Sequence, residues 1–138
     1  MLPEEIIKER ILIFDGAMGT QIAQAGPAAA DFGEYEGLNE YLSVTRPDLI
    51  EKIHSDYLAA GADVIETNTF GANAIVLAEY GLGNRVREFN MEAVKIAKRA
   101  AEKFYSPARP RFVAGSIGPT TASIFINSKI SFDRLREV

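Results

Sequence analysis

The sequence predicts an α/β fold: the first three βα units of a (β/α)8 TIM-type barrel, truncated before the barrel closes. Three short apolar runs, at 11–14, 62–66 and 111–114, each end in polar or glycine-rich residues, as buried parallel strands do. Helical patterns separate these runs, and alternating strands and helices indicate a parallel sheet with right-handed crossovers. Because such a barrel normally takes about 250 residues, we expect 1–138 to be the N-terminal part of a longer barrel domain. A small domain that completes its sheet by oligomerising is the alternative.

The first unit begins with a short amphipathic helix, predicted from Pro3 to Arg10. The run at 11–14 contains four consecutive apolar residues, which is typical of a strand buried on both faces. It leads into the polar, flexible segment 15–20, with the sequence Asp-Gly-Ala-Met-Gly-Thr. Residues 26–44 are acidic and interrupted by glycine and proline, so we expect a long loop with a short helical turn. Loops of this length are usually functional or mobile.

The second unit contains the helix that the sequence predicts most clearly, over 47–60. Pro47 suits a first helical position, where its missing N–H is not needed, and Gly61 suits the position after the last turn. Apolar residues recur between them at helical spacing. The strand at 62–66 follows directly, and a short helix is expected over 73–80.

The third unit pairs a long helix with the third strand. We expect Asn84 to cap this helix, which continues to about Phe104 and ends before two prolines. After the strand at 111–114, residues 120–130 form a predicted loop rich in Ser, Thr and Asn. Ser131 is expected to cap a last helix.

Composition excludes several classes of function. The formal net charge is −4, which argues against a surface for nucleic acids or anionic membranes. No apolar run approaches the ~20 residues that span a bilayer, and the acidic N-terminus does not resemble a signal peptide. The absence of cysteine excludes disulfides and thiolate metal ligands within the chain. We therefore expect a cytoplasmic protein.

Polar side chains follow the predicted strands at their carboxyl ends. Asp15 follows the first strand, Glu66 to Thr69 the second, and Gly115 to Thr120 the third. In parallel α/β proteins ligands bind outside this end of the sheet. We therefore expect a small-molecule site there. Segment 15–20 lacks the lysine of a P-loop and the spacing of a dinucleotide motif, which disfavours a nucleotide site.

Five motifs, in order along the chain, resemble a known family. They are ILIFDGAMGT at 11–20, EGLNEYL at 36–42, TRPD at 45–48, AGADVIETNTFGAN at 60–73 and VAGSIGPT at 113–120. They are similar to the N-terminal homocysteine-binding domain of cobalamin-dependent methionine synthases, within the wider homocysteine S-methyltransferases. The motifs at 36–42 and 45–48 favour the cobalamin branch over betaine- or methylmethionine-dependent homocysteine methyltransferases. A non-catalytic α/β module that binds a small amino acid is a further alternative.

The resemblance implies a (β/α)8 barrel and methyl transfer to the sulfur of homocysteine, giving methionine. It implies methylcobalamin as donor, recharged from 5-methyltetrahydrofolate by downstream folate- and cobalamin-binding domains. It also implies a zinc ion, held by three cysteines, that binds the thiolate. Because this chain has no cysteine, we expect the zinc ligands to lie beyond residue 138 and the chain to be inactive alone.

The resemblance and the chemistry of homocysteine together suggest binding roles. Asp15 and Glu66 are assigned to the ammonium group, since ammonium is recognised by carboxylates. The simpler interpretation is that Asp15 caps its turn and Glu66 pairs with a basic neighbour. The carboxylate of homocysteine is assigned to three backbone N–H groups with two assisting side chains: Gly16, Ala17 and Ser116, helped by Asn68 and Thr69.

Other candidate residues receive structural interpretations. His54, the single histidine, lies beside the apolar stripe of the helix 47–60 and cannot anchor a metal ion without partners. The charged residues of the helix from Asn84 to Phe104 are read as a solvated face. Gly115, Gly118 and Pro119 are expected to shape the exit of the third strand.

Overall fold

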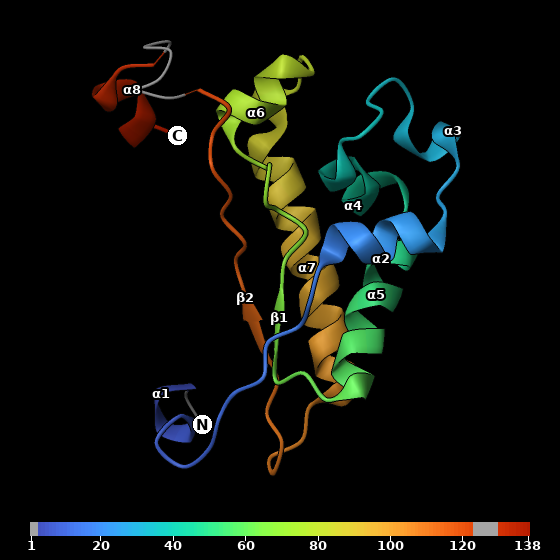
Figure 1. Ribbon diagram of the computed structural model, residues 1–138, viewed down its shortest axis with the longest axis vertical. Helices are drawn as coiled ribbons and strands as arrows, with labels where there is room; N and C mark the ends of the chain where they lie inside the picture. The colour runs from blue at the N-terminus through green and yellow to red at the C-terminus, as the bar shows by residue number, and fades with distance from the viewer. Residues whose placement is uncertain (1–2, 123–129) are drawn as a thin grey trace.

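The computed structural model describes residues 3–122 and 130–138. Strands β1 (Val64–Glu66) and β2 (Phe112–Ala114) pair in parallel. Phe14 forms a parallel bridge to Val64 on the other side of β1. Three segments therefore run in the same direction side by side, which confirms the predicted parallel α/β arrangement (Figure 1).

The predicted strand at 11–14 is reduced to this single bridge. The carbonyl of Ile13 accepts the N–H groups of Asp63 and Val64, at 2.7 and 3.1 Å. Ile11 and Phe14 are nevertheless 85% and 53% exposed. The prediction of a buried strand is wrong for the described residues, because among them β1 covers only one edge of this segment.

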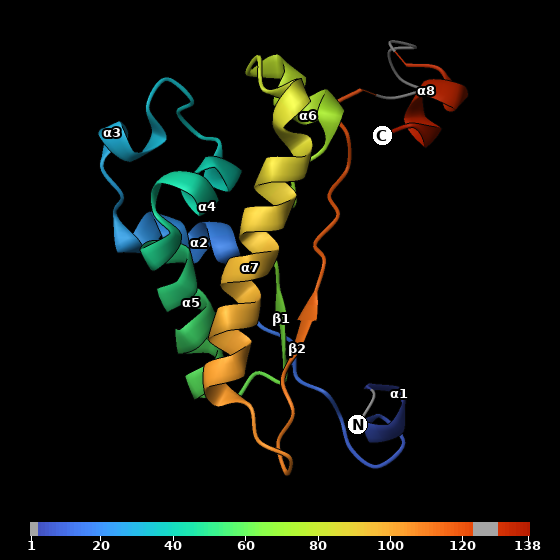
Figure 2. The same ribbon diagram turned by 180° about the vertical axis from the view of Figure 1, so that it is seen from behind.

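Two helices, α5 (Pro47–Ala60) and α7 (Val86–Phe104), pack together over one face of the strands (Figures 1 and 2). The bounds of α5 are those that the sequence predicts. Gly61 ends it with a φ of +118°, a left-handed conformation that glycine adopts without strain. The helix pair thus forms one outer layer beside the sheet.

The start of α7 differs from the prediction. A 3-10 turn, η2 (Gly83–Arg85), precedes it, so Asn84 lies inside this turn and the N-cap position is Arg85. The N–H of Arg85 donates to the carbonyl of Leu82, 2.9 Å away, which continues the turn to residue 85. The prediction that Asn84 caps α7 is therefore wrong.

The N-terminal third contains more helix than the sequence predicts. Helix α1 (Pro3–Ile6) is shorter than expected, and α2 (Met18–Ala25) was not predicted. The predicted loop at 26–44 holds three short elements: α3 (Ala29–Phe32), η1 (Asn39–Tyr41) and α4 (Leu42–Thr45).

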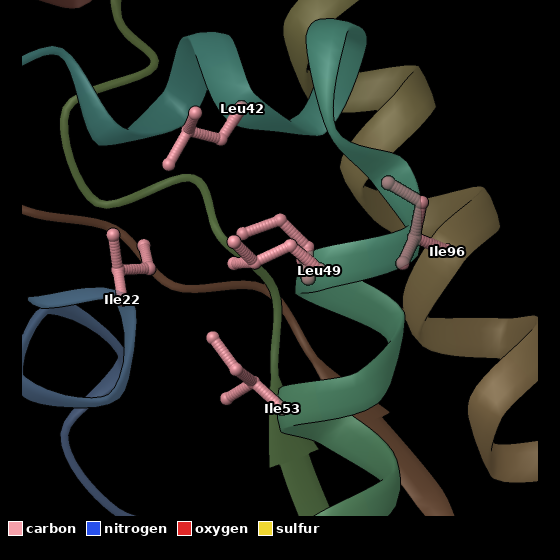
Figure 3. Close-up of a cluster of buried hydrophobic side chains, with 6 residues drawn as sticks. Ile22, Leu42, Leu49, Ile53 and Ile96 are labelled. Carbon is pink, nitrogen blue, oxygen red and sulfur yellow. The ribbon is translucent and has the colours of Figure 1, made fainter. Parts of the chain in front are cut away.

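A buried apolar cluster explains this extra helix. Ile22 of α2 and Leu42 of α4 are buried against Leu49 and Ile53 of α5 and Ile96 of α7 (Figure 3). Burying a side chain of this size contributes about 1.5–3 kcal/mol. Short helices with little propensity of their own are therefore held by contacts with α5.

Two side-chain caps occur in the C-terminal half, and of these the cap at Ser131 was predicted. Asn73 Oδ1 accepts the N–H groups of Ile75 and Val76 at the start of α6 (Ala74–Glu79). Ser131 Oγ accepts the N–H of Arg134 in α8 (Phe132–Arg136). Most of the predicted loop at 120–130 lies outside the described residues. Among the described helices, none has the length and apolar character needed to cross a membrane.

Candidate functional site

A cavity of about 420 Å³ lies where the first segment and β1 leave the sheet. Six of the seven predicted site residues line it: Asp15, Gly16, Ala17, Glu66, Asn68 and Ser116. Thr69 does not line it. The remaining lining residues are outside the predicted binding set, although Thr67 belongs to the polar stretch expected at the exit of the second strand: Met18, Gly19, Asn39, Glu40, Thr67 and Phe70. The carboxyl ends of adjacent parallel segments therefore meet at one site.

Asp15 and Glu66 are joined by the sheet. The N–H of Asp15 donates to the carbonyl of Val64, and Asp15 Oδ2 accepts the N–H of Glu66 at 3.0 Å. Burial, and to a smaller extent the charge of Glu66, raise the pKa of Asp15 to about 6, although the hydrogen bond from Glu66 opposes this. Asp15 thus contacts the neighbouring strand in addition to its own turn. Among the described residues, Glu66 forms no ion pair with a basic side chain.

The cavity lining is acidic. Glu40 is a third carboxylate on its wall and is itself buried, with Oε1 accepting the N–H of Gly71 at 2.6 Å. Among residues 3–122 and 130–138, no Lys, Arg or His lines the cavity. Such a lining suits a ligand with a cationic group. In the sequence, Glu40 was one acidic residue among several in a predicted loop, and only the fold of η1 places it inside.

The turn at Gly16 and Ala17 begins α2. A Cβ on Gly16 would lie 2.9 Å from the hydroxyl of Tyr57, so a larger residue here would require the Tyr57 side chain to shift. Ala17 is the N-cap position of α2 and has no side chain able to cap the helix. The first N–H groups of a helix lack partners within it and attract anions. This geometry is compatible with the predicted contact to a substrate carboxylate.

Two buried threonine hydroxyls and the half-buried backbone of Ser116 link the exits of β1 and β2. The N–H of Ser116 donates to Thr67 Oγ1 at 3.1 Å, and Thr69 Oγ1 donates to the carbonyl of Ser116 at 2.8 Å. The two threonine hydroxyls are 2.6 Å apart. The Ser116 N–H that the sequence assigns to a substrate carboxylate is therefore occupied by Thr67. Substrate contacts of Ser116 and Thr69 stay predictions.

Asn68 points to the other side of the same loop. Its Nδ2 donates to the carbonyl of Asn39 at 2.9 Å and to Ser43 Oγ at 3.1 Å. Asn68 is therefore a bridge between β1 and the η1–α4 segment as well as a lining residue.

A family model described as "Homocysteine S-methyltransferase" matches residues 12–138. The chain belongs to this family.

Curated relatives of this homocysteine S-methyltransferase chain include two methionine synthases. It is 45% identical over 117 residues to "Methionine synthase" from Mycobacterium tuberculosis (strain ATCC 25618 / H37Rv), and 44% identical over 117 residues to that from Mycobacterium leprae (strain TN). Each alignment covers 85% of this chain but 10% of the relative. The chain thus spans about a tenth of the length of these relatives.

Solved structures of the homocysteine methyltransferase MmuM from Escherichia coli share the fold. The oxidized form has a TM-score of 0.70 and 30% identity, covering 84% of this chain and 40% of that one. The metallated form has a TM-score of 0.69 and 28% identity, covering 83% and 40%. The mixed α/β arrangement is therefore shared with this protein over most of the chain.

The remaining candidates in this homocysteine S-methyltransferase chain lie outside the cavity. His54 is buried on α5 and is not a lining residue, in agreement with its structural interpretation. Arg85 pairs with Glu88 and Lys95 with Glu92 along α7, as expected for a solvated face. Residues 3–122 and 130–138 contain no group of three or more His, Asp or Glu placed to hold a metal ion.

Two glycines after β2 give a matched pair for a stability test. A Cβ on Gly118 would clash with the carbonyl oxygen of Phe70, whereas a Cβ on Gly115 would meet nothing within 4 Å. We expect Gly118→Ala to lower the free energy of unfolding by about 1–3 kcal/mol, because backbone must move to relieve the clash. Gly115→Ala should leave it within about 0.5 kcal/mol of the parent. Urea unfolding followed by circular dichroism measures both, and equal effects would contradict the close approach.

Proposed function

We propose that the protein carrying this chain methylates the sulfur of homocysteine, and that this chain supplies the part that binds the amino-acid end of the substrate. The observation that carries this proposal is the meeting of Asp15 and Glu66 at one acidic cavity, which has no basic residue in its lining within the described part of the chain. A carboxylate pair in such a place favours an ammonium group. The names of the relatives, methionine synthase and homocysteine methyltransferase, supply the substrate and the reaction.

In this proposal the ammonium of homocysteine binds Asp15 and Glu66, and its carboxylate approaches the N–H groups of Gly16 and Ala17. The hydrogen bond from Glu66 N–H orients the Asp15 carboxylate. Asn68 forms the facing wall and is fixed by Asn39 and Ser43. The thiol is then the part of the substrate left for chemistry outside these contacts.

The methyl donor is proposed to be methylcobalamin, recharged by 5-methyltetrahydrofolate, giving methionine. The 45% identity to a methionine synthase supports this branch. A betaine- or methylmethionine-dependent methyltransferase is the second candidate, supported by the structural similarity to MmuM at 30% identity. The folate- and cobalamin-binding domains of the first candidate are proposed partners, and the greater length of the curated relatives leaves room for them. A cytoplasmic location is part of the same proposal.

A zinc site does not fit the residues present. The sequence has no cysteine, and the described part of the chain has no cluster of metal-ligating side chains. We therefore propose that the zinc ligands lie outside these 138 residues. A bound zinc ion would favour the thiolate form of a coordinated thiol.

Calorimetric titration of homocysteine, with and without zinc, tests this division of roles. The titration compares this chain with a version extended to the length of the curated relatives. We expect zinc-dependent binding only in the longer protein. Equal zinc-dependent affinity in the 138-residue chain would contradict the placement of the metal, and no binding by the longer protein would contradict the substrate.

The pKa of Asp15 predicts how homocysteine affinity changes with pH. Since Asp15 ionises near pH 6, and the ammonium requires the carboxylate form, affinity in the longer protein should rise about tenfold from pH 5 to pH 7 and then level off. Asp15→Asn should bind at least about tenfold more weakly at pH 7 and lose this pH dependence. Asp56→Asn is the control, because Asp56 lies exposed on α5 and pairs with Lys52. Calorimetry at several pH values measures the affinity of each variant. If the affinity of Asp15→Asn changed with pH as the parent's does, the assignment of Asp15 to the ammonium group would be excluded.

A further inference from the structure

We infer that Thr67 and Thr69 are positioning residues for substrate binding: with Ser116 they close a hydrogen-bonded ring that fixes the exit loop of β1 against that of β2. The substrate in this inference is the one of the proposed function, on which it rests. The ring itself is a property of the fold and can be tested without the substrate.

The proton positions in the ring follow from its contacts. The N–H of Ser116 must donate to Thr67 Oγ1, and the single hydroxyl proton of Thr69 is directed to the carbonyl of Ser116. The proton between the two hydroxyl oxygens, 2.6 Å apart, is therefore that of Thr67. Each group donates to the next, and the ring closes. Thr67 and Thr69 are both buried, so the contact between their hydroxyls forms away from solvent, while the two bonds to Ser116 are partly buried.

Backbone contacts extend the same junction in both directions. The N–H of Thr67 donates to the carbonyl of Ala114 at 2.9 Å, and the N–H of Gly118 donates to the carbonyl of Phe70 at 3.0 Å. The ring lies between these two bonds, where β-ladder pairing has already ended. Side-chain hydroxyls therefore replace the backbone ladder beyond the end of the strands.

The opposite side of the β1 exit is held by a different set of groups. Asn68 donates to Asn39 and Ser43, and Glu40 accepts from Gly71. Alternate residues of the loop thus bind to opposite neighbours, with Thr67 and Thr69 toward β2 and Asn68 toward η1 and α4. Glu66 precedes this clamped stretch and lines the cavity. A loop held from both sides keeps the Glu66 carboxylate and the Asn68 side chain in place at the cavity wall.

Valine is the matched substitution for the test, because it keeps the shape of threonine and removes the hydroxyl. Thr67→Val leaves the Ser116 N–H without its acceptor, and Thr69→Val leaves the Ser116 carbonyl without its donor. In the complete gene product we expect the Kd and KM for homocysteine to rise about tenfold in each, with kcat within about threefold. Thr67→Ser and Thr69→Ser keep the hydroxyl and should stay within about twofold of the parent.

Two controls separate positioning from general loss of structure. Thr45→Val removes a hydroxyl that donates to Asp31 and Tyr41 outside the cavity, and it should leave the KM for homocysteine unchanged. The double variant Thr67→Val, Thr69→Val should have a KM for homocysteine no higher than that of the single variant with the higher KM, because each single substitution already breaks the ring. Amide hydrogen exchange should show a protected Ser116 N–H in the parent and lost protection in Thr67→Val.

The outcomes distinguish this inference from the proposed function. A parent protein that does not bind homocysteine overturns the proposed function, and with it the positioning role. A parent that binds, with valine variants that bind equally well, overturns the positioning role alone. A fall in kcat without a rise in KM would assign the threonines to stability, and this too would overturn it.

Discussion

Asp63→Ala is expected to lower the free energy of unfolding by about 3–5 kcal/mol. The Asp63 side chain is 2% exposed and lies between Arg10 and Arg111. Its two oxygens accept from Arg10 at 2.7 and 3.0 Å, and Oδ2 also accepts the N–H of Ile13 at 3.1 Å. Removing this carboxylate leaves the buried guanidinium of Arg111, 5% exposed, without its counter-charge.

The pH dependence of this contribution follows from the pKa of Asp63. The hydrogen bond from Arg10 holds that pKa below its usual value, against the opposing effect of burial. A lowered pKa stabilises the fold above the unfolded value of 3.8, and the stabilisation is lost as the pH falls through the folded value. Guanidinium unfolding at pH 7 and at pH 3 should therefore show a smaller difference between parent and variant at pH 3.

Asp56→Ala is the control for Asp63→Ala. Asp56 pairs with Lys52 on the surface of α5, where both side chains are more than half exposed. Exposed pairs contribute about 0–1 kcal/mol, so this variant should unfold almost as the parent does. If the two variants lost the same stability, the ion cluster around Asp63 would not be what holds Arg10 and Ile13 to β1.

His54→Leu is expected to make the fold more stable below pH 6.5, by up to about 3 kcal/mol near pH 4. His54 is fully buried, and among the described residues neither ring nitrogen has a hydrogen-bond partner. Burial lowers the pKa of His54 to about 4, although the charge of Glu51 opposes this. As the pH falls, His54 therefore binds a proton near pH 6.5 in the unfolded chain but only near pH 4 in the folded chain. The stability present above pH 6.5 is lost progressively as the pH falls to 4.

Asp15 acts in the opposite direction over part of this range. Because the pKa of Asp15 is raised to about 6, the stability it contributes below pH 3.8 is lost as the pH rises through 6. The dependence of the parent's stability on pH therefore combines the titrations of His54 and Asp15. The difference between parent and His54→Leu, measured by urea unfolding from pH 4 to pH 8, isolates the histidine. A difference that does not change with pH would show that His54 titrates normally in the folded chain.

Much of the fold follows from local sequence patterns. The apolar stripe of α5 and the residues that start and end this helix lie close together in the sequence, so Pro47 and Gly61 predict its bounds. Asp15, Glu66 and Ser116 were predicted to share one site because parallel strands bring their carboxyl ends to one edge. In contrast, α2 offers little local signal, and its formation depends on the burial of Ile22 against α5.

The sequence by itself determined the alternation of strands and helices, the family, and the acidic residues at two strand exits, since each depends on residue order alone. Only the tertiary structure decided that Glu40 joins the cavity, that Asp63 neutralises arginines from two distant segments, and that Thr67 and Thr69 bind Ser116. These contacts join residues about 30 to 50 positions apart. The strength of these contacts depends on burial and on the distance between two partners. Neither quantity can be read from the residue at a single position in the chain.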